Sequence, residues 1–294
     1  MSATPEGRPK GRVTTTSLAA MKAADEPIVM ITAYDAPGAR LADAAGVDVI
    51  LVGDSLGMTV LGHSSTLPVT MDDMVRATSA VCRGASRALV VADMPFLSCH
   101  VGVEEAIRNA GRLLAEAGAQ AVKIEGGVAI APLVEWLVEA GIPVMGHVGL
   151  TPQSVNVFGG YSVQGRTFDA ALQLVEDCLA LEAAGAFGVV LELVPAELAQ
   201  LVSEELRIPT IGIGAGAGCD GQVQVFHDVL GMGTFTPKHA RRYAEIGAAI
   251  ESAIAEYAAD VRVGAFPAEA NYSHLDPEVV AELERALPMA GEEE

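Results

Sequence analysis

Ionisable residues stand at the ends of several short apolar runs whose composition is that of buried β-strands. A strand of a parallel sheet is covered on both faces, so a charged side chain there is costly unless it is paired or binds a metal. Repetition of this pattern at the same end of successive strands indicates a catalytic face. The residues in these positions are Asp54, Asp93, Lys123, Glu125, His147 and Glu192.

Three of these side chains, Asp54, Asp93 and Glu125, are carboxylates from consecutive strand runs. Period-two alternation places Asp54 on the same face as Ile50 and Val52. Oxygen ligands without cysteine suit a hard cation, which favours Mg²⁺ and leaves Mn²⁺ and Co²⁺ open. Such an ion could bind a 2-oxo acid through its carboxylate and keto oxygens. It would stabilise the enolate that forms when the neighbouring carbon loses a proton.

Two further residues extend this chemistry. Lys123 shares a face with Glu125 and would add fixed positive charge for the same oxyanion. Glu192 stands between Leu191 and Leu193 in the sixth apolar run, and this apolar setting suits the base that removes the proton.

Simpler interpretations of the same residues remain open. Asp54 and Asp93 could cap turns, a role that aspartate often serves. Lys123 and Glu125 could form a structural ion pair, and His147 could be a hydrogen-bonded core residue. The coincidence of all these groups at one end of the strands favours a functional site.

The elements that must position these groups alternate along most of the chain. Short β-branched runs are separated by Ala- and Leu-rich segments of helical spacing, which is typical of βαβ units and a parallel sheet. Eight strands, each followed by a helix, favour a closed (β/α)8 TIM barrel over a doubly wound sheet. The expected strands are residues 28–33, 48–53, 88–93, 121–126, 143–148, 188–193, 209–214 and 222–227.

The barrel is expected to occupy residues 14–264 and to begin with a Ser/Thr-capped helix at 14–24. Residues 1–13 are rich in Pro, Gly and Arg and are expected to be disordered. Residues 265–294 form a C-terminal tail with one helical pattern, DPEVVAELERAL, before an acidic end.

Two connections, residues 54–70 and 149–166, are long for loops that follow barrel strands, which indicates a functional role. The glycine-rich stretch 212–222 lacks the spacing and lysine of a phosphate-binding loop. Its glycines could serve tight turns or a ligand loop. The basic cluster 238–242 is expected to begin a helix.

Composition excludes several classes of function. The formal net charge of −20 is opposite to that of a nucleic-acid-binding protein. The four cysteines form no C-x-x-C pair, which argues against a zinc site or disulfide scaffold and for a reducing cytoplasm. Cys99 follows Asp93 in a loop and could be exposed. The N-terminus lacks a signal-peptide core, and no apolar run reaches the roughly 18 residues of a membrane span.

Several longer motifs carry a specific resemblance. From about residue 14 to 264, in order and without large gaps, the chain resembles the ketopantoate hydroxymethyltransferase family. The motifs are TAYD (32–35), ILVGDSLGM (50–58), TLPVT (66–70), VADMPF (91–96), GIPVMGHVGLTPQS (141–154), GGYSVQGR (159–166) and IPTIGIGAG–CDGQV (208–223).

This resemblance implies a barrel of the phosphoenolpyruvate/pyruvate type that uses Mg²⁺. The substrates would be 3-methyl-2-oxobutanoate and the carbon donor 5,10-methylenetetrahydrofolate, and the product 2-dehydropantoate, on the route to pantothenate and coenzyme A. The family forms large homo-oligomers, typically decamers.

The resemblance also implies roles for residues in the matching motifs. Asp54 and Asp93 would be metal ligands, Glu125 would join them directly or through water, and Glu192 would accept the proton. Because the folate donor is anionic, the mouth of the site should be less negative than the chain as a whole. The oxo acid would contact Asp54, Ser55, Asp93 and Lys123, and His147 would line the site.

Two rival functions remain at this stage. A lyase of the same barrel superfamily would share the Mg²⁺ and the oxo-acid enolate. Lyases of the isocitrate type usually carry a cysteine in a basic motif near the fourth strand, and the segment EGG at 125–127 has none. A non-catalytic metabolite-binding barrel would not need Glu192.

Overall fold

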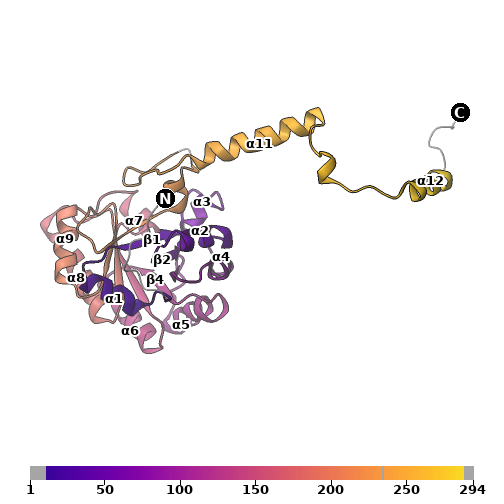
Figure 1. The fold of residues 1–294 in the computed structure, drawn as a ribbon. Coiled ribbons are helices and arrows are strands. Elements are labelled where there is room, and N and C mark those ends of the chain that lie inside the picture. The colour runs from indigo at the N-terminus through magenta and orange to yellow at the C-terminus, as the bar shows by residue number, and fades with distance from the viewer. Residues whose placement is uncertain (1–10, 234, 288–294) are drawn as a thin grey trace. The chain divides into compact units, whose positions relative to one another are not determined.

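The chain folds into a closed barrel of eight parallel strands in the computed structural model, which describes residues 11–233 and 235–287 (Figure 1). Neighbouring strands pair in sequence order, and β8 pairs with β1 to close the barrel. This confirms the expected (β/α)8 fold. The strands are β1 Ile28–Thr32, β2 Val49–Val52, β3 Leu89–Asp93, β4 Ala121–Glu125, β5 Val144–Gly149, β6 Gly188–Glu192, β7 Thr210–Ile213 and β8 Gly221–Gln224.

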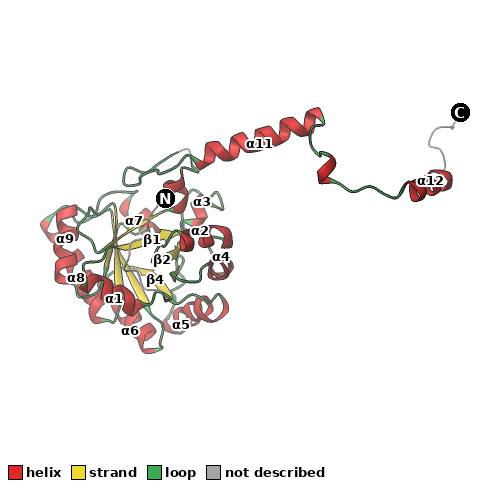
Figure 2. Cartoon of the chain, viewed as in Figure 1, coloured by secondary structure: helices red, strands yellow, loops and turns green. Residues whose placement is uncertain are grey.

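Helices surround these strands, as Figure 2 shows in red around the yellow barrel. Most of them are the crossover helices that the Ala- and Leu-rich segments predict. The first 244 residues hold α1 Thr15–Ala23, α2 Ala36–Ala44, α3 Leu56–Thr59, α4 Met71–Gly84, α5 Val103–Gly111, the π-helical turn η1 Arg112–Glu116, the short turn η2 Val128–Ile130, α6 Ala131–Glu139, the turn η3 Pro152–Ser154, α7 Val155–Phe158, α8 Phe168–Ala183, α9 Ala196–Glu205 and α10 Phe226–Leu230.

Alternate residues of the strands β2 to β6 belong to two different apolar cores. Val49 and Leu51 of β2 pack in the inner core of the barrel, whereas Ile50 and Val52 pack in the outer core between strands and helices. This is the period of two that a strand covered on both faces requires.

Helix α1 begins as expected, because Thr14 caps it by accepting a hydrogen bond from the Ser17 backbone N–H. Its buried residues Leu18 and Met21 join the inner core with the first residues of several strands, including Ile28 of β1. The N-terminal helix thus packs against the amino end of the barrel interior.

The chain after β8 departs from the expected helix start at residues 238–242. These residues lie in turns, with Ala240 N donating to Pro237 O, and the Arg242 guanidinium donates to Gly233 O and Thr236 Oγ1. Turn formation around Pro237 therefore delays the helix, and α11 begins only at Ile246.

Residues 1–244 and 245–294 form two separate compact units, a division that comes earlier than the expected boundary at 264. The second unit contains α11 Ile246–Val263, the turn η4 Glu269–Asn271 and α12 Pro277–Ala286. The expected tail helix is α12, which Asp276 caps. The expectation of disorder over residues 1–13 falls mainly outside the described residues. No helix among residues 11–233 and 235–287 has the length and apolar character needed to span a membrane.

The end of β5 shows how closely two strand ends approach each other. Gly149 has a φ of +89°, in a region that side chains rarely adopt. A Cβ atom at this position would lie 2.3 Å from the Glu192 carbonyl oxygen. That oxygen also accepts a hydrogen bond of 2.8 Å from Leu150 N, so it is held in place.

We predict that Gly149→Ala destabilises the protein more than Gly159→Ala does. Gly159 also has a positive φ, +70°, but no atom lies within 4 Å of a Cβ built there, so its substitution carries only the backbone strain of about 1–2 kcal/mol. Gly149→Ala adds a steric clash to that strain. Urea unfolding of both variants measures the difference, and equal losses of unfolding free energy would contradict the close approach.

Candidate active site

A cavity of about 610 Å³ opens at the carboxyl ends of the strands. This volume is typical of a small-molecule site, and that end of a TIM barrel is where active sites form. The cavity brings together every site residue that the sequence singled out. These residues are Asp54, Ser55, Asp93, Lys123, Glu125, His147 and Glu192.

Five of these residues reach the cavity through the alternation of the strands. Asp93 ends β3, Lys123 and Glu125 belong to β4, His147 to β5, and Glu192 ends β6. Each lies an even number of residues after an apolar residue of the inner core, so its side chain points into the barrel. The amino halves of the strands fill the core, and the carboxyl ends carry the chemistry.

Asp54 reaches the same cavity in a different way from the one expected. Ile50 and Val52 pack in the outer core, so continued alternation would direct Asp54 away from the barrel interior. The strand β2 ends at Val52, however, and a turn at Gly53 redirects the chain. Asp54 then lines the cavity, and its backbone N–H donates to Asp93 Oδ2 at 3.1 Å.

The buried charges at this site lie close enough to change one another's pKa values. Lys123 Nζ lies 2.6 Å from Asp93 Oδ1. Burial raises the pKa of Asp93 although Lys123 opposes the shift. The pKa of Asp54 is raised well above its usual range by burial and by the negative charges of Asp93 and Glu125. Burial acts to lower the pKa of Lys123, but the negative charges of Asp93, Glu125 and Asp54 raise it by more than burial lowers it. Lys123 therefore stays protonated.

His147 connects Lys123 to two acids. Its Nδ1 lies 3.0 Å from Lys123 Nζ and 3.3 Å from Glu125 Oε1, and its Nε2 lies 3.2 Å from Glu192 Oε2. Burial and Lys123 lower the pKa of His147, but hydrogen bonds to Glu125 and Glu192 raise it more, to about 9.

The ring contacts allow two protonation states. A neutral ring accepts from Lys123 and donates through Nε2 to Glu192, whereas a protonated ring donates to both acids. The contact with the Lys123 ammonium favours the neutral ring, whereas the raised pKa of His147 favours the protonated ring. The excess of carboxylates over cations in the cavity favours the protonated ring. In both states the Nε2 proton is directed at Glu192.

Gln153 is a site residue that the sequence analysis did not single out, although it lies in the long connection 149–166 and in the TPQS motif. It is buried, and its backbone N–H donates to Glu125 Oε2 at 3.0 Å. Burial acts to raise the pKa of Glu125, but hydrogen bonds from His147 and Gln153 and the charge of Lys123 leave it lowered. Glu125 is therefore ionised.

The three candidate metal ligands share the cavity but do not form a set of three direct ligands. Within the described ranges, no three His, Cys, Asp or Glu side chains gather closely enough to hold a metal ion by themselves. Asp54 and Asp93 are in contact, whereas Glu125 is engaged by His147 and Gln153. This arrangement fits two direct carboxylates with Glu125 acting through water.

Two further residues named in the sequence analysis, Ser55 and Cys99, lie near the charged groups. Ser55 Oγ lies 2.8 Å from the Tyr34 hydroxyl. Cys99, which the sequence suggested could be exposed, is buried because its loop folds back onto the barrel. Burial raises its pKa to about 12, so the thiol is no nucleophile at neutral pH.

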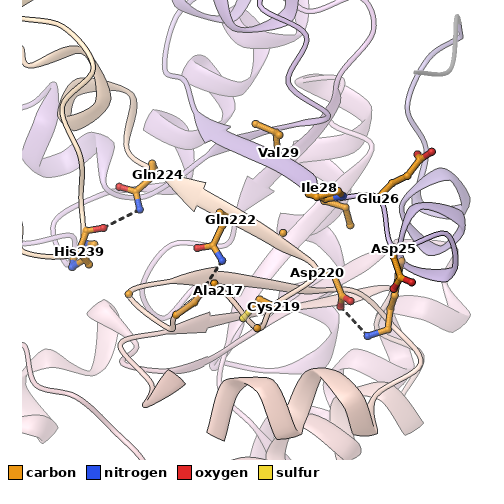
Figure 3. Close-up of a pocket in the computed structure, with 16 residues that line it drawn as sticks. Asp25, Glu26, Ile28, Val29, Ala217, Cys219, Asp220, Gln222, Gln224 and His239 are labelled. Atoms are coloured by element: carbon orange, nitrogen blue, oxygen red, sulfur yellow. Dashed lines mark hydrogen bonds and ion pairs between the residues drawn. The ribbon is translucent and has the colours of Figure 1, made fainter. Parts of the chain in front are cut away.

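A larger hollow of about 720 Å³ lies outside this site, beside β1 and β8 (Figure 3). Asp220 in its wall is paired with Lys22 at 2.8 Å. The glycine-rich stretch 212–222 lines this hollow, and a Cβ at Gly216 would lie 2.5 Å from Ala196 Cβ, so this glycine serves close packing. We assign the chemistry to the smaller cavity, because that is where the buried charges converge.

The buried pair of Lys123 and Asp93 allows a test by a double-mutant cycle. Lys123→Met leaves a buried carboxylate without its cation and should lower the unfolding free energy by about 3–5 kcal/mol. Adding Asp93→Asn should recover much of this loss, because the uncompensated charge is removed.

Urea unfolding in the presence of EDTA measures each variant of the cycle. Arg207→Met is the control, because Arg207 is 89% exposed and its ion pair with Glu182 should contribute about 0–1 kcal/mol. Additive losses in the double variant would show that the two buried charges do not depend on each other.

Comparison with known proteins agrees with the geometry. The family model described as ketopantoate hydroxymethyltransferase matches residues 12–269. A protein of Chloroflexus aurantiacus named 3-methyl-2-oxobutanoate hydroxymethyltransferase is 57% identical over 277 residues, which cover 94% of this chain and 97% of the relative. A protein of the same name from Roseiflexus sp. (strain RS-1) is 59% identical, with coverage of 94% and 98%.

Solved structures with low sequence identity share the fold. Phosphonopyruvate hydrolase in complex with oxalate and Mg²⁺ has a TM-score of 0.58 at 13% identity and covers 93% of this chain and 95% of its own. The 2,3-dimethylmalate lyase structure has a TM-score of 0.56 at 18% identity, with coverage of 92% and 96%. These likenesses concern the barrel alone, whereas the family match spans most of the chain. The sequence identity and the matched family model together show that this chain is an enzyme of the ketopantoate hydroxymethyltransferase family.

Proposed function

We propose that this enzyme transfers a hydroxymethyl group from 5,10-methylenetetrahydrofolate to 3-methyl-2-oxobutanoate and produces 2-dehydropantoate. The observation that carries the proposal is the convergence of four carboxylates, one lysine and one histidine in one cavity at the carboxyl ends of β2 to β6. The close relatives are named for the hydroxymethyl transfer to this oxo acid. The donor is taken from the family resemblance, and the chemical steps are our inference from the site.

The donor set fits a divalent cation such as Mg²⁺. Asp93 Oδ1 and Glu125 Oε1 are buried, and their partners are the charged or titratable groups of Lys123 and His147, so neither oxygen is occupied by a neutral N–H donor. Mg²⁺ is commonly held by one or two carboxylates and completes its shell with water and substrate oxygens. Asp54 and Asp93 would hold the ion, with Glu125 joining through water. A solved barrel of the same fold carries Mg²⁺ with oxalate, whose adjacent oxygens resemble those of a 2-oxo acid.

The bound cation would act as a Lewis acid that favours negative charge on the keto oxygen of the oxo acid. Lys123 contributes to the same end, because its ammonium is buried, permanently protonated and fixed by Asp93. Leu51, Val190 and Ile213 provide an apolar wall of the cavity that suits the branched carbon chain of the substrate.

Glu192 is placed to act as the base. It lines the cavity with 16% of its side chain exposed, and its Oε2 faces His147 Nε2. Glu192 takes the proton from C3, and the electron pair of the C–H bond moves into the enolate. C3 then forms a bond to the donor methylene while one of the two bonds from this methylene to the folate nitrogens breaks. Water replaces the second nitrogen and supplies the hydroxyl group, and tetrahydrofolate leaves with the C3 proton on one nitrogen and a proton from water on the other.

The rest of the cavity wall suits a flat anionic donor. Outside the chemical cluster, the lining residues with a carboxylate, ammonium or imidazole group are Asp228, Lys238 and His239. One acid beside two basic residues supports the proposal that the mouth is less negative than the chain, whose net charge is −20. Tyr161 and Phe235 add exposed aromatic rings for stacking.

The base assignment predicts the exchange of one proton with solvent. With Mg²⁺ and without folate, the enzyme should exchange the C3 proton of 3-methyl-2-oxobutanoate with deuterium, and proton NMR follows the loss of the signal. Glu192→Gln should slow exchange by about 10²–10⁴-fold, the usual contribution of a general base.

Glu197→Gln is the matched control, because Glu197 is an exposed carboxylate on α9 just beyond the site. It should exchange as fast as the unaltered enzyme. Undiminished exchange in Glu192→Gln would remove the base role and would favour the alternative of a metabolite-binding barrel that does not need this residue.

Metal removal gives a further expectation. Treatment with EDTA should abolish both deuterium exchange and hydroxymethyl transfer, and Mg²⁺ should restore them, because the oxyanion would otherwise meet four carboxylates with little compensation. Asp54→Asn should not be restored at the same Mg²⁺ concentration. Full turnover after EDTA treatment, checked by metal analysis of the protein, would reject a metal-dependent mechanism.

A further inference from the structure

Gln153 forms hydrogen bonds to residues at the ends of three strands. Its side-chain amide donates to Asp54 Oδ2 and to Met94 O, both at 3.0 Å. Its backbone N–H donates to Glu125 Oε2, also at 3.0 Å. Gln153, in the loop that follows β5, therefore binds the segments at the ends of β2, β3 and β4.

The position of Gln153 is itself fixed by its short loop. Leu150 N donates to Glu192 O at 2.8 Å, and Ser154 N donates to Thr151 O at 2.8 Å. Pro152 opens the turn that contains Gln153, and the glutamine is only 7% exposed. A buried amide in a turn with fixed hydrogen bonds has little freedom to follow its partners, so it holds them in place.

The hydrogen bonds leave a definite set of carboxylate oxygens. Gln153 occupies Oδ2 of Asp54 and Oε2 of Glu125, and the Asp54 backbone N–H occupies Oδ2 of Asp93. Each acid thus has one oxygen held by a neutral N–H donor and one oxygen left for charged partners. Donors of this kind orient carboxylates that bind metals, and their loss commonly weakens metal binding.

We propose that Gln153 is a positioning residue that holds the Asp54 and Glu125 carboxylates in the arrangement required for divalent-ion binding. The proposal rests on the proposed function, because it assumes that these acids serve an ion. Gln153 does not contact the reacting atoms. It acts through the two acids that it orients.

Gln153→Met tests the role of the amide. Methionine has a similar length and an apolar end, so it removes both side-chain donors and keeps the backbone N–H that binds Glu125. We expect the Mn²⁺ dissociation constant of the full-length, metal-free protein, measured by electron paramagnetic resonance, to rise about 10–100-fold. Turnover should largely recover at saturating Mn²⁺, because the base Glu192 and Lys123 are unchanged.

The matched control is Gln173→Met on the exposed face of α8, because the Gln173 amide donates to Asp177 on the same helix, away from the site. It should bind Mn²⁺ as the unaltered protein does. Should Gln153→Met fail to fold, Gln153→Asn serves instead, because it keeps an amide but shortens its reach to Asp54. An increased Mn²⁺ dissociation constant in Gln153→Asn supports the proposal.

Three outcomes separate the possible failures. An unchanged Mn²⁺ dissociation constant in either folded Gln153 variant overturns the positioning role and leaves the proposed function intact. A lower melting temperature of the metal-free protein with normal Mn²⁺ binding assigns Gln153 a structural role only. Absence of Mn²⁺ binding by the unaltered protein overturns both the ion site and the role of Gln153.

Discussion

Concentration of negative charge inside the barrel is the constraint on which the site depends. Asp54, Asp93, Glu125 and Glu192 meet there, and Lys123 forms a direct ion pair with Asp93. Buried carboxylates are unfavourable without compensation, and the fold supplies it through the lysine, the imidazole of His147 and N–H donors from the backbone. The raised pKa values of Asp54 and Asp93 show that this compensation is incomplete. A divalent cation of the kind proposed above would supply the missing positive charge.

Much of this arrangement could be predicted from the sequence because barrel strands have a strict period of two. An apolar residue of the inner core followed two places later by an ionisable residue, as in Val91 and Asp93 or Ala121 and Lys123, must direct both side chains to the interior. The closed order of the strands then brings their carboxyl ends to one cavity. The eight strands and the convergence of the charged residues followed from these rules.

The same rule is wrong where the strand has already ended. Asp54 was placed by alternation on the face of Ile50 and Val52, but a turn at Gly53 brings it into the cavity by a different route. Local hydrogen bonding also determines the conformation of residues 238–242, where Arg242 binds the Gly233 carbonyl and the Thr236 hydroxyl and no helix begins. Gln153 could not be singled out, because an amide in a loop carries no periodic signal and its partners lie far away in the sequence.

The packing of helix α1 has a consequence for the order in which the two reactants bind. Leu18 and Met21 fill the amino end of the barrel interior, so the cavity communicates with its surroundings at the opposite end. In the proposed reaction the oxo acid binds deep among the strand ends, and the larger folate approaches after it through the same opening. An entrance that both reactants share imposes a kinetic sequence, in which the deeper reactant binds first and its product departs last.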